Sequence, residues 1–550
     1  MDEIKTQLKN IIKDLYGLDF NVVVTVAPEN AGADFSSNVA MQLTKDLHKN
    51  PREIAGEIAE HISGYEVEIA GPGFLNFKIS DKYYADKLVS LSSDFGADVS
   101  CEDFAGKTVI CEFSDPNPFK VLHVGHLYTS IVGDSIARLF EYAGAKVIRA
   151  NFGGDVGLHV GKTMWALLKS GMKDFTIEDI AAKYVEGTRA YEDDEVAKAE
   201  IVEINKKVYE IAEKDLHDSE LAEIYWKGRE LSYKYFEDFY ARIGVKFDKY
   251  YPESTVAGRG LAEVRKGLEA GVYEASDGAV VYRGDTKLGL HTRVFINKEG
   301  LPTYEAKDVG LIFTKWDDYH FDKSVVITGN DIIDYMKIVL GSVGEMNPEL
   351  PKRTTHLTHG QVKLPGSVKM SSRKGNFLKA VDVLDLVSDE LKNSYNSEDF
   401  DVALGATKYA FLKYKMGGDI IFDPNESVKM TGNSGPYLLY SCVRAKKVLE
   451  KLQSSPLTED ADLSFDVHER NMIKKIVQYK DVLTEAVVEM APHKVCGFLY
   501  ELAQEFSRFY ENCPVAGNER EVVRGTIVAV YEKVMEHGLN ILGINIPEEM

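Results

Sequence analysis

The feature that most constrains the fold is a strand–loop–helix–strand pattern between residues 107 and 153. KTVICEF (107–113) and AKVIRANFG (145–153) have the short apolar pattern of buried strands, and residues from about 125 to 143 have helical periodicity. Consecutive strands connected through a helix lie parallel in one sheet, with a right-handed crossover. The pattern therefore predicts a βαβ unit in an open parallel sheet.

Further strand patterns follow at 278–284, 292–298 and 324–330. A charged stretch of helical period, from about 165 to 245, separates them from the first βαβ unit. This order predicts a sheet built in two halves, with the charged stretch as a helical insertion.

The two ends of the chain have different patterns. Near the N-terminus, helical spacing at 3–15 and 51–62 alternates with a strand pattern at 20–28 and a hairpin pattern at 65–80. The last 125 or so residues contain only helical patterns. We therefore expect three domains: a small α/β domain at 1–105, a parallel-sheet domain at 106–424 and an all-α domain at 425–550.

Composition excludes several classes of protein. With 550 residues, 44% of them hydrophobic, the chain can fill several cores. Its five cysteines are scattered and form no C-x-x-C pair, so we expect reduced thiols and no zinc site. The first residues lack the features of a signal peptide, and no run of 18 apolar residues occurs. These features predict a soluble, cytoplasmic protein that does not contact membranes.

The net charge of −22 argues at first against nucleic acid, because an acidic surface repels phosphates at long range. The charge is distributed unevenly, however. Residues 351–380 contain seven lysines and arginines and no acidic residue, and residues 427–449 contain four and none. Local basic patches therefore leave nucleic-acid binding open, with strong salt dependence.

The sharpest local motif is His123-Val124-Gly125-His126, at the predicted start of the helix that follows the first strand. A helix N-terminus offers free N–H groups and the positive end of its dipole, and a glycine lets a ligand approach the backbone. The two imidazoles, three residues apart, can face the same side and donate to a phosphate. A metal-binding H-x-x-H pair and an incidental pair of histidines are the competing interpretations.

A second motif is LPGSVKMSSRKGN (364–376), which places Lys369, Arg373 and Lys374 in one loop. Such a loop can close over a polyphosphate, although a solvated basic loop is the commoner case. GLHVGKT (157–163) resembles a phosphate-binding P-loop but has three residues between its glycines where four are required. We interpret it as the start of a helix.

H-V-G-H followed by K-M-S-S-R resembles the two signature motifs of class I aminoacyl-tRNA synthetases. The rest of the chain resembles one family among them, the arginyl-tRNA synthetases, over nearly its whole length. The matching segments lie at 33–62, 71–80, 114–157, 303–310, 317–331, 404–414, 432–449 and 492–515. This resemblance implies a Rossmann-like catalytic domain, an N-terminal domain that binds the tRNA elbow and a helical anticodon-binding domain.

The resemblance also implies a function. Arginine and ATP would form arginyl-adenylate and pyrophosphate, and the arginyl group would pass to the 3′-terminal ribose of tRNA(Arg). ATP would bring Mg²⁺ as a counter-ion, with no zinc or other metal held by the protein, and the enzyme would act as a monomer. The matched positions assign catalysis to Lys120, His123, Gly125, His126 and Lys369.

Further roles carry over by position. The same catalytic residues, together with His359, Gln361, Val362, Met370, Ser371, Ser372 and Arg373, match positions that bind ATP. The substrate guanidinium requires carboxylate acceptors. Glu112, Ser114, Asn117, Tyr304 and Asp308 match the arginine site, with Asp308 as the guanidinium partner; Phe74, Asn76, Tyr437, Arg508 and Met550 match tRNA-binding positions. For Phe74 and Tyr437, the competing interpretation is ordinary core packing. For Asp308, it is an exposed charge at the start of a helix.

The chain departs from the family pattern at several positions. Ser372 stands where a second lysine is usual, and Lys120 matches the lysine that compensates for it. Val156, His159 and Ile332 replace residues that are common near the pockets, and Phe119 replaces an alanine. Another class I synthetase, a small-molecule adenylyltransferase and a non-catalytic tRNA-binding paralogue stay open as alternatives. The cysteinyl type is disfavoured by the lack of Cys/His zinc ligands, and the paralogue by the presence of both motifs.

Overall fold

The computed structural model describes residues 2–28, 32–284, 289–366, 378–452 and 464–550. The chain divides into two compact units. The first comprises residues 1–100, 441–483 and 498–536, and the second comprises residues 101–440, 484–497 and 537–550. In the described ranges, no helix is both long and apolar enough to cross a membrane.

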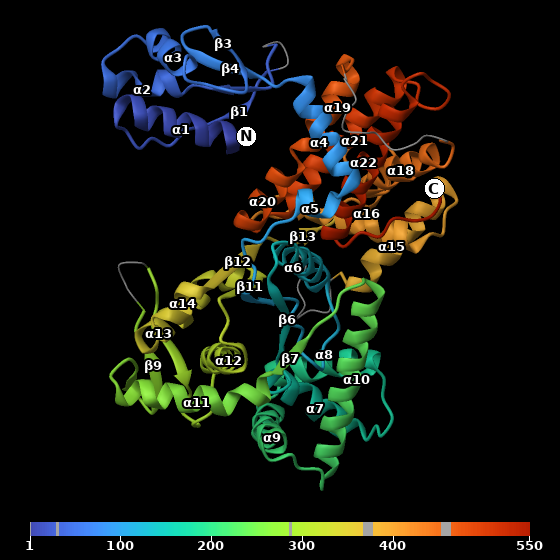
Figure 1. The fold of residues 1–550 in the computed structure, drawn as a ribbon. Helices are drawn as coiled ribbons and strands as arrows, with labels where there is room; N and C mark the ends of the chain where they lie inside the picture. The colour runs from blue at the N-terminus through green and yellow to red at the C-terminus, as the bar shows by residue number, and fades with distance from the viewer. Residues whose placement is uncertain (1, 29–31, 285–288, 367–377, 453–463) are drawn as a thin grey trace. The chain divides into compact units, whose positions relative to one another are not determined.

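The second unit is built on a five-stranded sheet in the order β12-β11-β5-β6-β7 (Figure 1). Every neighbouring pair in this sheet is parallel. The predicted βαβ unit is confirmed as β5 (Thr108–Glu112), α6 (Val124–Tyr142) and β6 (Lys146–Gly153). The other strands are β7 (Lys249–Pro252), β11 (Lys323–Gly329) and β12 (Thr354–His359).

Strand β5 is the point where the order of the sheet reverses. The chain leaves it through α6 toward β6 on one side, whereas β11, which comes much later in the chain, pairs with its other side. In open parallel sheets, ligands bind outside the carboxyl ends of the strands at this kind of reversal. The loop after β5 is therefore the first place to look for a site.

The prediction for two later strands was wrong. β9 (Ala279–Tyr282) and β10 (Arg293–Ile296) do not join the parallel sheet but form an antiparallel sheet with β8 (Glu274–Ser276). The ten residues between β9 and β10 are too few for the helical crossover that parallel neighbours require. The pattern at 20–28 yields only the short β1 (Thr25–Val26).

Helices pack against the sheets of the second unit. α6 packs against β5, β6 and β11. A separate apolar cluster joins Ile110 and Ile148 of the parallel sheet to α11, α12 and α13. The helices, with the two short strands β13 and β14, are α7 (Leu158–Ser170), α8 (Ile177–Asp193), α9 (Glu195–Lys214), α10 (Glu220–Arg242), α11 (Glu253–Glu269), α12 (Tyr304–Tyr319), α13 (Ile333–Met346), α14 (Glu349–Arg353), β13 (Val362–Lys363), α15 (Ala380–Tyr395), α16 (Phe400–Leu412), β14 (Ile420–Ile421) and α17 (Pro424–Ser427).

The first unit contains an antiparallel sheet in the order β1-β2-β4-β3, which includes the predicted hairpin. Its elements are α1 (Asp2–Tyr16), β2 (Phe35–Ser37), α2 (Val39–Leu47), α3 (Pro51–Ala59), β3 (Glu66–Ala70), β4 (Phe74–Lys78), α4 (Asp81–Ser93), α5 (Phe95–Val99) and α19 (Val467–Val477). Four more helices contribute residues to both units: α18 (Gly435–Leu449), α20 (Tyr479–Glu489), α21 (Pro492–Asn512) and α22 (Glu521–Ile541).

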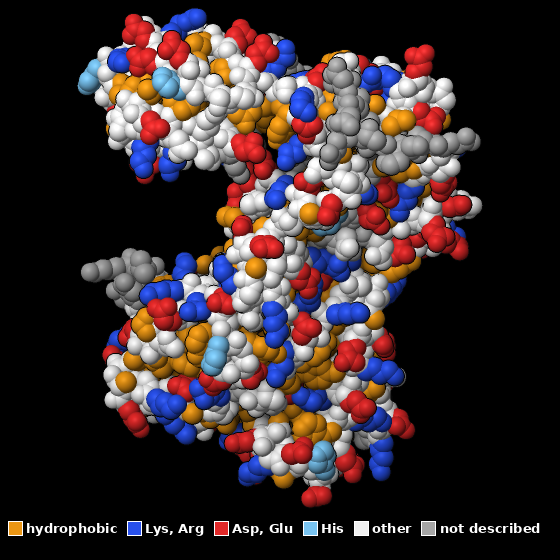
Figure 2. Space-filling view, in the orientation of Figure 1, with side chains coloured by type: hydrophobic (Ala, Val, Ile, Leu, Met, Phe, Trp, Pro, Cys, Tyr) orange, Lys and Arg blue, Asp and Glu red, His pale blue; other side chains and the backbone are white. Residues whose placement is uncertain are grey.

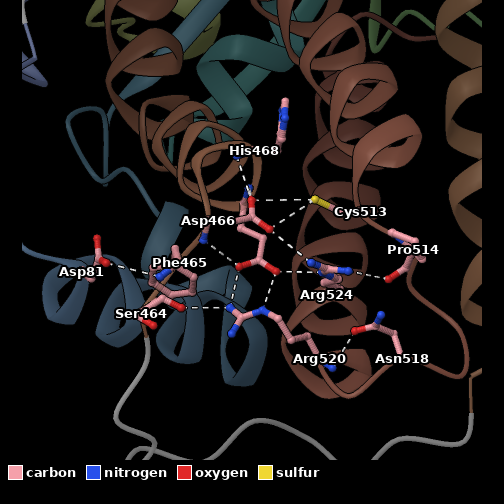
Figure 3. Close-up of polar contacts among 11 residues, drawn as sticks. Asp81, Ser464, Phe465, Asp466, His468, Cys513, Pro514, Asn518, Arg520 and Arg524 are labelled. Carbon is pink, nitrogen blue, oxygen red and sulfur yellow. Dashed lines mark hydrogen bonds and ion pairs between the residues drawn. The ribbon is translucent and has the colours of Figure 1, made fainter.

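A network of ion pairs around the buried carboxylate of Glu469 links α19 to α22 and to Cys513, which directly follows α21 (Figure 3). The fully buried carboxylate of Glu469 accepts from Nε of Arg520 and Nε of Arg524, each at 2.8 Å. Asp466, the N-cap residue of α19, accepts from Arg524 and from the thiol of Cys513. Burial raises the pKa of Glu469, but the hydrogen bonds from the two arginines outweigh burial and leave this pKa below its usual value.

We predict that Glu469→Gln lowers the free energy of unfolding of the first unit by about 3–5 kcal/mol at pH 7, because it leaves two arginines without their carboxylate. Since the folded-state pKa of Glu469 is lowered, its contribution is present above the unfolded pKa and is lost as the pH falls through the folded value. Urea unfolding should therefore show the difference from wild type shrinking below about pH 4.

Asp86→Asn is the matched control, because the ion pair of Asp86 with Lys82 is exposed. The control should cost less than about 1 kcal/mol. Equal losses for the two variants would contradict a stabilising role for the network.

Candidate active site

Two imidazoles close the first turn of α6, directly after the loop that follows β5. The N–H of Gly125 donates to Nδ1 of His123, and the N–H of His123 donates to Nδ1 of His126, both at 3.1 Å. The two rings stack, with centroids 3.9 Å apart. Because each Nδ1 is an acceptor, each neutral ring carries its hydrogen on Nε2. The helix N-terminus therefore holds two oriented N–H donors where its dipole favours an anion such as phosphate.

The surroundings keep both rings uncharged. Burial, with the nearby charges of Lys120 and His359, lowers the pKa of His123 to about 4. Burial also lowers the pKa of His126 well below its usual value, and His123 adds to this effect. A Cβ at position 125 would lie 2.8 Å from Cε1 of His123, so any residue other than glycine would displace this ring.

Other residues predicted to bind ATP lie close to this helix end or follow β12. His359 is the last residue of β12, and its ring packs edge-on against Tyr128 of α6, with centroids 4.8 Å apart. The N–H of Gln361 donates to the carboxylate of Asp419, and Val362 lies buried in β13. Nζ of Lys120 lies 4.9 Å from the ring centre of Tyr184.

The predicted lysine-rich loop, with Lys369, Met370, Ser371, Ser372 and Arg373, lies outside the described residues. The residues that follow it contact the histidine motif. The N–H of Val124 donates to the carbonyl of Leu378 (2.9 Å), and Lys379 forms a β-bridge with His123. The chain directly after the second predicted phosphate motif is therefore adjacent to the first motif, although the two lie far apart in the sequence.

Buried charges gather beside the carboxyl end of β5. Glu112, the last residue of β5, accepts from Nζ of Lys315 at 2.6 Å, and both side chains are almost fully buried. Glu253, at the start of α11, forms a second buried pair with Lys307 of α12. The two lysines of this cluster are thus already paired with carboxylates.

Asp308, another carboxylate of the cluster, accepts from a neutral donor, the phenol of Tyr335. The pKa of Asp308 is raised to about 7. Burial is the main cause and the charges of Glu112 and Glu253 add to it, while the hydrogen bond from Tyr335 acts in the opposite direction. A carboxyl group in this state gains most from a cation, because a cation compensates both burial and the neighbouring negative charges. The cluster can therefore accept a cationic, donor-rich group.

The remaining residues predicted for arginine line the same region. Oγ of Ser114 shares a hydrogen bond with the hydroxyl of Tyr240 (2.8 Å), and Oδ1 of Asn117 accepts from the N–H of Gly154 (3.0 Å). Tyr304 begins α12, is 53% exposed, and has its ring 4.7 Å from Nζ of Lys307.

The residues predicted to bind tRNA have different environments. On β4, Phe74 is 36% exposed, whereas Asn76 is buried and accepts from the hydroxyl of Ser36. Arg508 is exposed on α21, where it pairs with Glu505, and Tyr437 and Met550 are partly buried. On the face shown in Figure 2, basic and acidic side chains are interspersed, so the negative charge of the chain forms no single patch there.

The sequence did not reveal Glu253, Lys307, Lys315 or Tyr335 as members of the site. The pairs they form join residues that are 27 to 203 positions apart in the chain. The available signal was weak: Lys307 and Lys315 lie near apolar residues of α12, a helix that also carries four acidic residues, and lysines are buried only when they are paired.

A parallel sheet whose strand order reverses at β5, and an H-x-G-H motif at the following helix N-terminus, define the catalytic domain of a class I aminoacyl-tRNA synthetase. Residues 96–423 match the family model for the class I (R) tRNA synthetase catalytic domain. Residues 438–550 match the DALR anticodon-binding domain, and residues 2–79 match the arginyl-tRNA synthetase N-terminal domain. The chain belongs to the arginyl-tRNA synthetases.

Individual relatives agree with this assignment. The chain is 27% identical to an arginine–tRNA ligase of Parabacteroides distasonis, over 98% of both chains. It is 28% identical to one of Fusobacterium nucleatum, over 96% of this chain and 95% of that protein. Its fold is similar to those of two solved arginyl-tRNA synthetases at 21% identity. The TM-score is 0.80 for the Thermus thermophilus structure, with both chains fully covered, and 0.82 for that of Plasmodium falciparum, with 100% and 99% covered.

The enzyme therefore activates L-arginine with ATP and transfers it to tRNA(Arg). Neither another class I synthetase nor a paralogue is favoured. In the described ranges no group of three or more histidine, cysteine or acidic side chains is placed to hold a metal ion.

We predict that His123 and His126 stay uncharged down to pH 5, because burial lowers both pKa values. Their imidazole signals in NMR spectra of the histidine-labelled protein should show no titration between pH 8 and pH 5, and His123 should titrate near pH 4. His123→Asn and His126→Asn would assign the signals. A midpoint near 6.5 for either ring would contradict the hydrogen-bonded arrangement described above.

Proposed function

We propose that the buried carboxylates beside β5 bind the guanidinium of arginine, with Asp308 as its main acceptor and Glu253 as a second. The observation that carries this proposal is the state of Asp308, which lies among carboxylates and is bound to a neutral phenol. A planar guanidinium presents five donors and can contact two carboxylates at once. Glu112, Ser114, Asn117 and Tyr304 surround the other polar groups of arginine.

At the other end of the loop, His123, Gly125 and His126 hold the phosphates of ATP, together with Lys120. His359, Gln361 and Val362 contact the nucleotide, and the loop of Lys369, Met370, Ser371, Ser372 and Arg373 stabilises the charge of the departing pyrophosphate. The carboxylate of arginine attacks the α-phosphate in line, its oxygen bonds to phosphorus, and the bond to the pyrophosphate oxygen breaks. This step needs positioning and charge stabilisation rather than proton transfer, which suits neutral imidazole donors.

For tRNA(Arg) we propose contacts to Phe74 and Asn76 at the elbow, and to Tyr437, Arg508 and Met550 near the anticodon. The division into domains at 1–105, 106–424 and 425–550 is supported by the ranges of the three family models. Mg²⁺ accompanies ATP, bound by its phosphates, and supplies further neutralisation of their charge. We propose that the enzyme acts as a monomer in the cytoplasm.

The first test is ATP–pyrophosphate exchange with each of the twenty amino acids, with and without tRNA(Arg). Exchange should occur with arginine alone, because a site whose carboxylates match the shape of a guanidinium discriminates against the other side chains. Exchange with a different amino acid, or none in the presence of tRNA, would overturn the proposal.

A second test uses the pKa of Asp308, which is about 7. Only the ionised carboxylate binds a cation strongly, so the KM for arginine should rise about tenfold from pH 8 to pH 6, while the KM for ATP changes little. Asp308→Asn should raise the KM for arginine by about 100-fold and abolish its dependence on pH.

Asp317→Asn is the matched control on the same helix, since Asp317 is exposed and pairs with Arg259. Its KM for arginine should stay within about twofold of wild type. If Asp308→Asn raised the KM for ATP as much as that for arginine, the role of Asp308 would be wrong.

A further inference from the structure

The loop between β5 and α6 has an unusual backbone. Ser114, Asp115 and Phe119 all adopt left-handed conformations, with φ of 72°, 47° and 64°. Residues other than glycine adopt this region rarely, and strained conformations persist only where the surrounding structure holds them in place. This loop joins the proposed arginine end of the site, at Ser114 and Asn117, to its proposed ATP end, at Lys120 and His123.

One face of α10, the last helix of the insertion, contacts this loop. Tyr225, Gly228, Ser232 and Tyr240 follow helical spacing and lie on one side of α10. Each of them touches Ser114 or Phe119. The helix is therefore part of the site rather than an addition on its outside.

Phe119 is held at three points. Its ring is fully buried and stacks on that of Tyr225, with centroids 5.9 Å apart. The ring lies over Gly228, where a Cβ would be 2.4 Å from Cε1 of Phe119. Its N–H donates to Oγ of Ser232 (3.0 Å), which itself donates to the carbonyl of Gly228 (2.7 Å). Phe119 immediately precedes Lys120, so these contacts set where Lys120 leaves the loop.

Ser114 is held by Tyr240. Nδ2 of Asn151 donates to the hydroxyl of Tyr240 at 3.2 Å. The hydroxyl of Tyr240 also shares a hydrogen bond with Oγ of Ser114, 2.8 Å away. Tyr240 therefore fixes where the side chain of Ser114 lies.

The same face also holds the loop after β6. Asp155 is fully buried, and its Oδ2 accepts from Nε of Arg229 (2.9 Å) and from Oγ of Ser254 (2.7 Å). Ser254 directly follows Glu253, the second proposed guanidinium acceptor. Helix α10 thus reaches both ends of the site.

We infer that α10 is a positioning element of the active site, in which Ser232, through Phe119, sets the ATP end of the loop and Tyr240, through Ser114, sets the arginine end. This inference rests on the proposed roles of Lys120 and Ser114. It makes Ser232 and Tyr240 positioning residues with separable effects, because they act on different ends of one loop.

The test is ATP–pyrophosphate exchange by full-length Ser232→Ala and Tyr240→Phe, measured with tRNA(Arg) present. Each substitution removes one hydroxyl and retains the remaining packing. Ser232→Ala should raise the KM for ATP about fivefold and leave the KM for arginine within about twofold of wild type. Tyr240→Phe should raise the KM for arginine about fivefold and leave the KM for ATP within about twofold of wild type. Tyr233→Phe is the matched control on the same helix, because the ring of Tyr233 contacts Arg229 and Tyr250 rather than the loop.

The contrary results are equally specific. A merely structural role would shift both KM values together, in proportion to a lower melting temperature, and would overturn the inference. Unchanged KM values in both variants, or an equal effect of Tyr233→Phe, would overturn it as well. If Asp308→Asn behaves as expected while these variants do not, the inference fails and the proposed function stands. If Asp308→Asn also fails, the arginine site itself is misassigned.

Discussion

The position of β5 at the centre of the parallel sheet is the constraint on which the active site depends. Its last residue, Glu112, carries a carboxylate of the buried cluster, and fourteen residues later His126 completes the first turn of α6. One short segment therefore connects the group of buried charges to the helix end that we propose binds phosphate. The left-handed residues of this segment follow from that requirement, since the chain must turn sharply between two fixed points.

Local signals in the sequence predict the parts of this arrangement that are local in the chain. The strands β5 and β6, the helix between them and the histidines at its start follow from apolar periodicity and from the position of His123. The sequence does not predict β7 and β12, because KYYP is very short and TTHLTH is largely polar. Both strands are specified by their neighbours in the sheet.

The site itself is less predictable, for a physical reason. Asp308 could be assigned from the family resemblance, but its partner Tyr335 and the pairs Glu253–Lys307 and Glu112–Lys315 exist only once distant elements have packed together. The insertion at 165–245 is helical as expected. Its contribution to the site was not visible, because contacts such as those of Ser232 and Tyr240 join residues more than a hundred positions apart.

The proposed phosphate end and the proposed arginine end of the site use charge differently. This difference bears on how the enzyme discriminates arginine from lysine. At the proposed phosphate end, the donors are neutral imidazoles, so positive charge comes from lysines such as Lys120. At the proposed arginine end, Glu253 is already paired with Lys307, and Asp308 is bound to the neutral phenol of Tyr335. A guanidinium offers donors in a planar fork, whereas the compact ammonium of lysine is a single point charge. Bound to Asp308, an ammonium would leave acceptors that the planar guanidinium can reach without a donor, at a cost of about 1–3 kcal/mol. Discrimination then comes from the group left unsatisfied rather than from extra contacts to arginine.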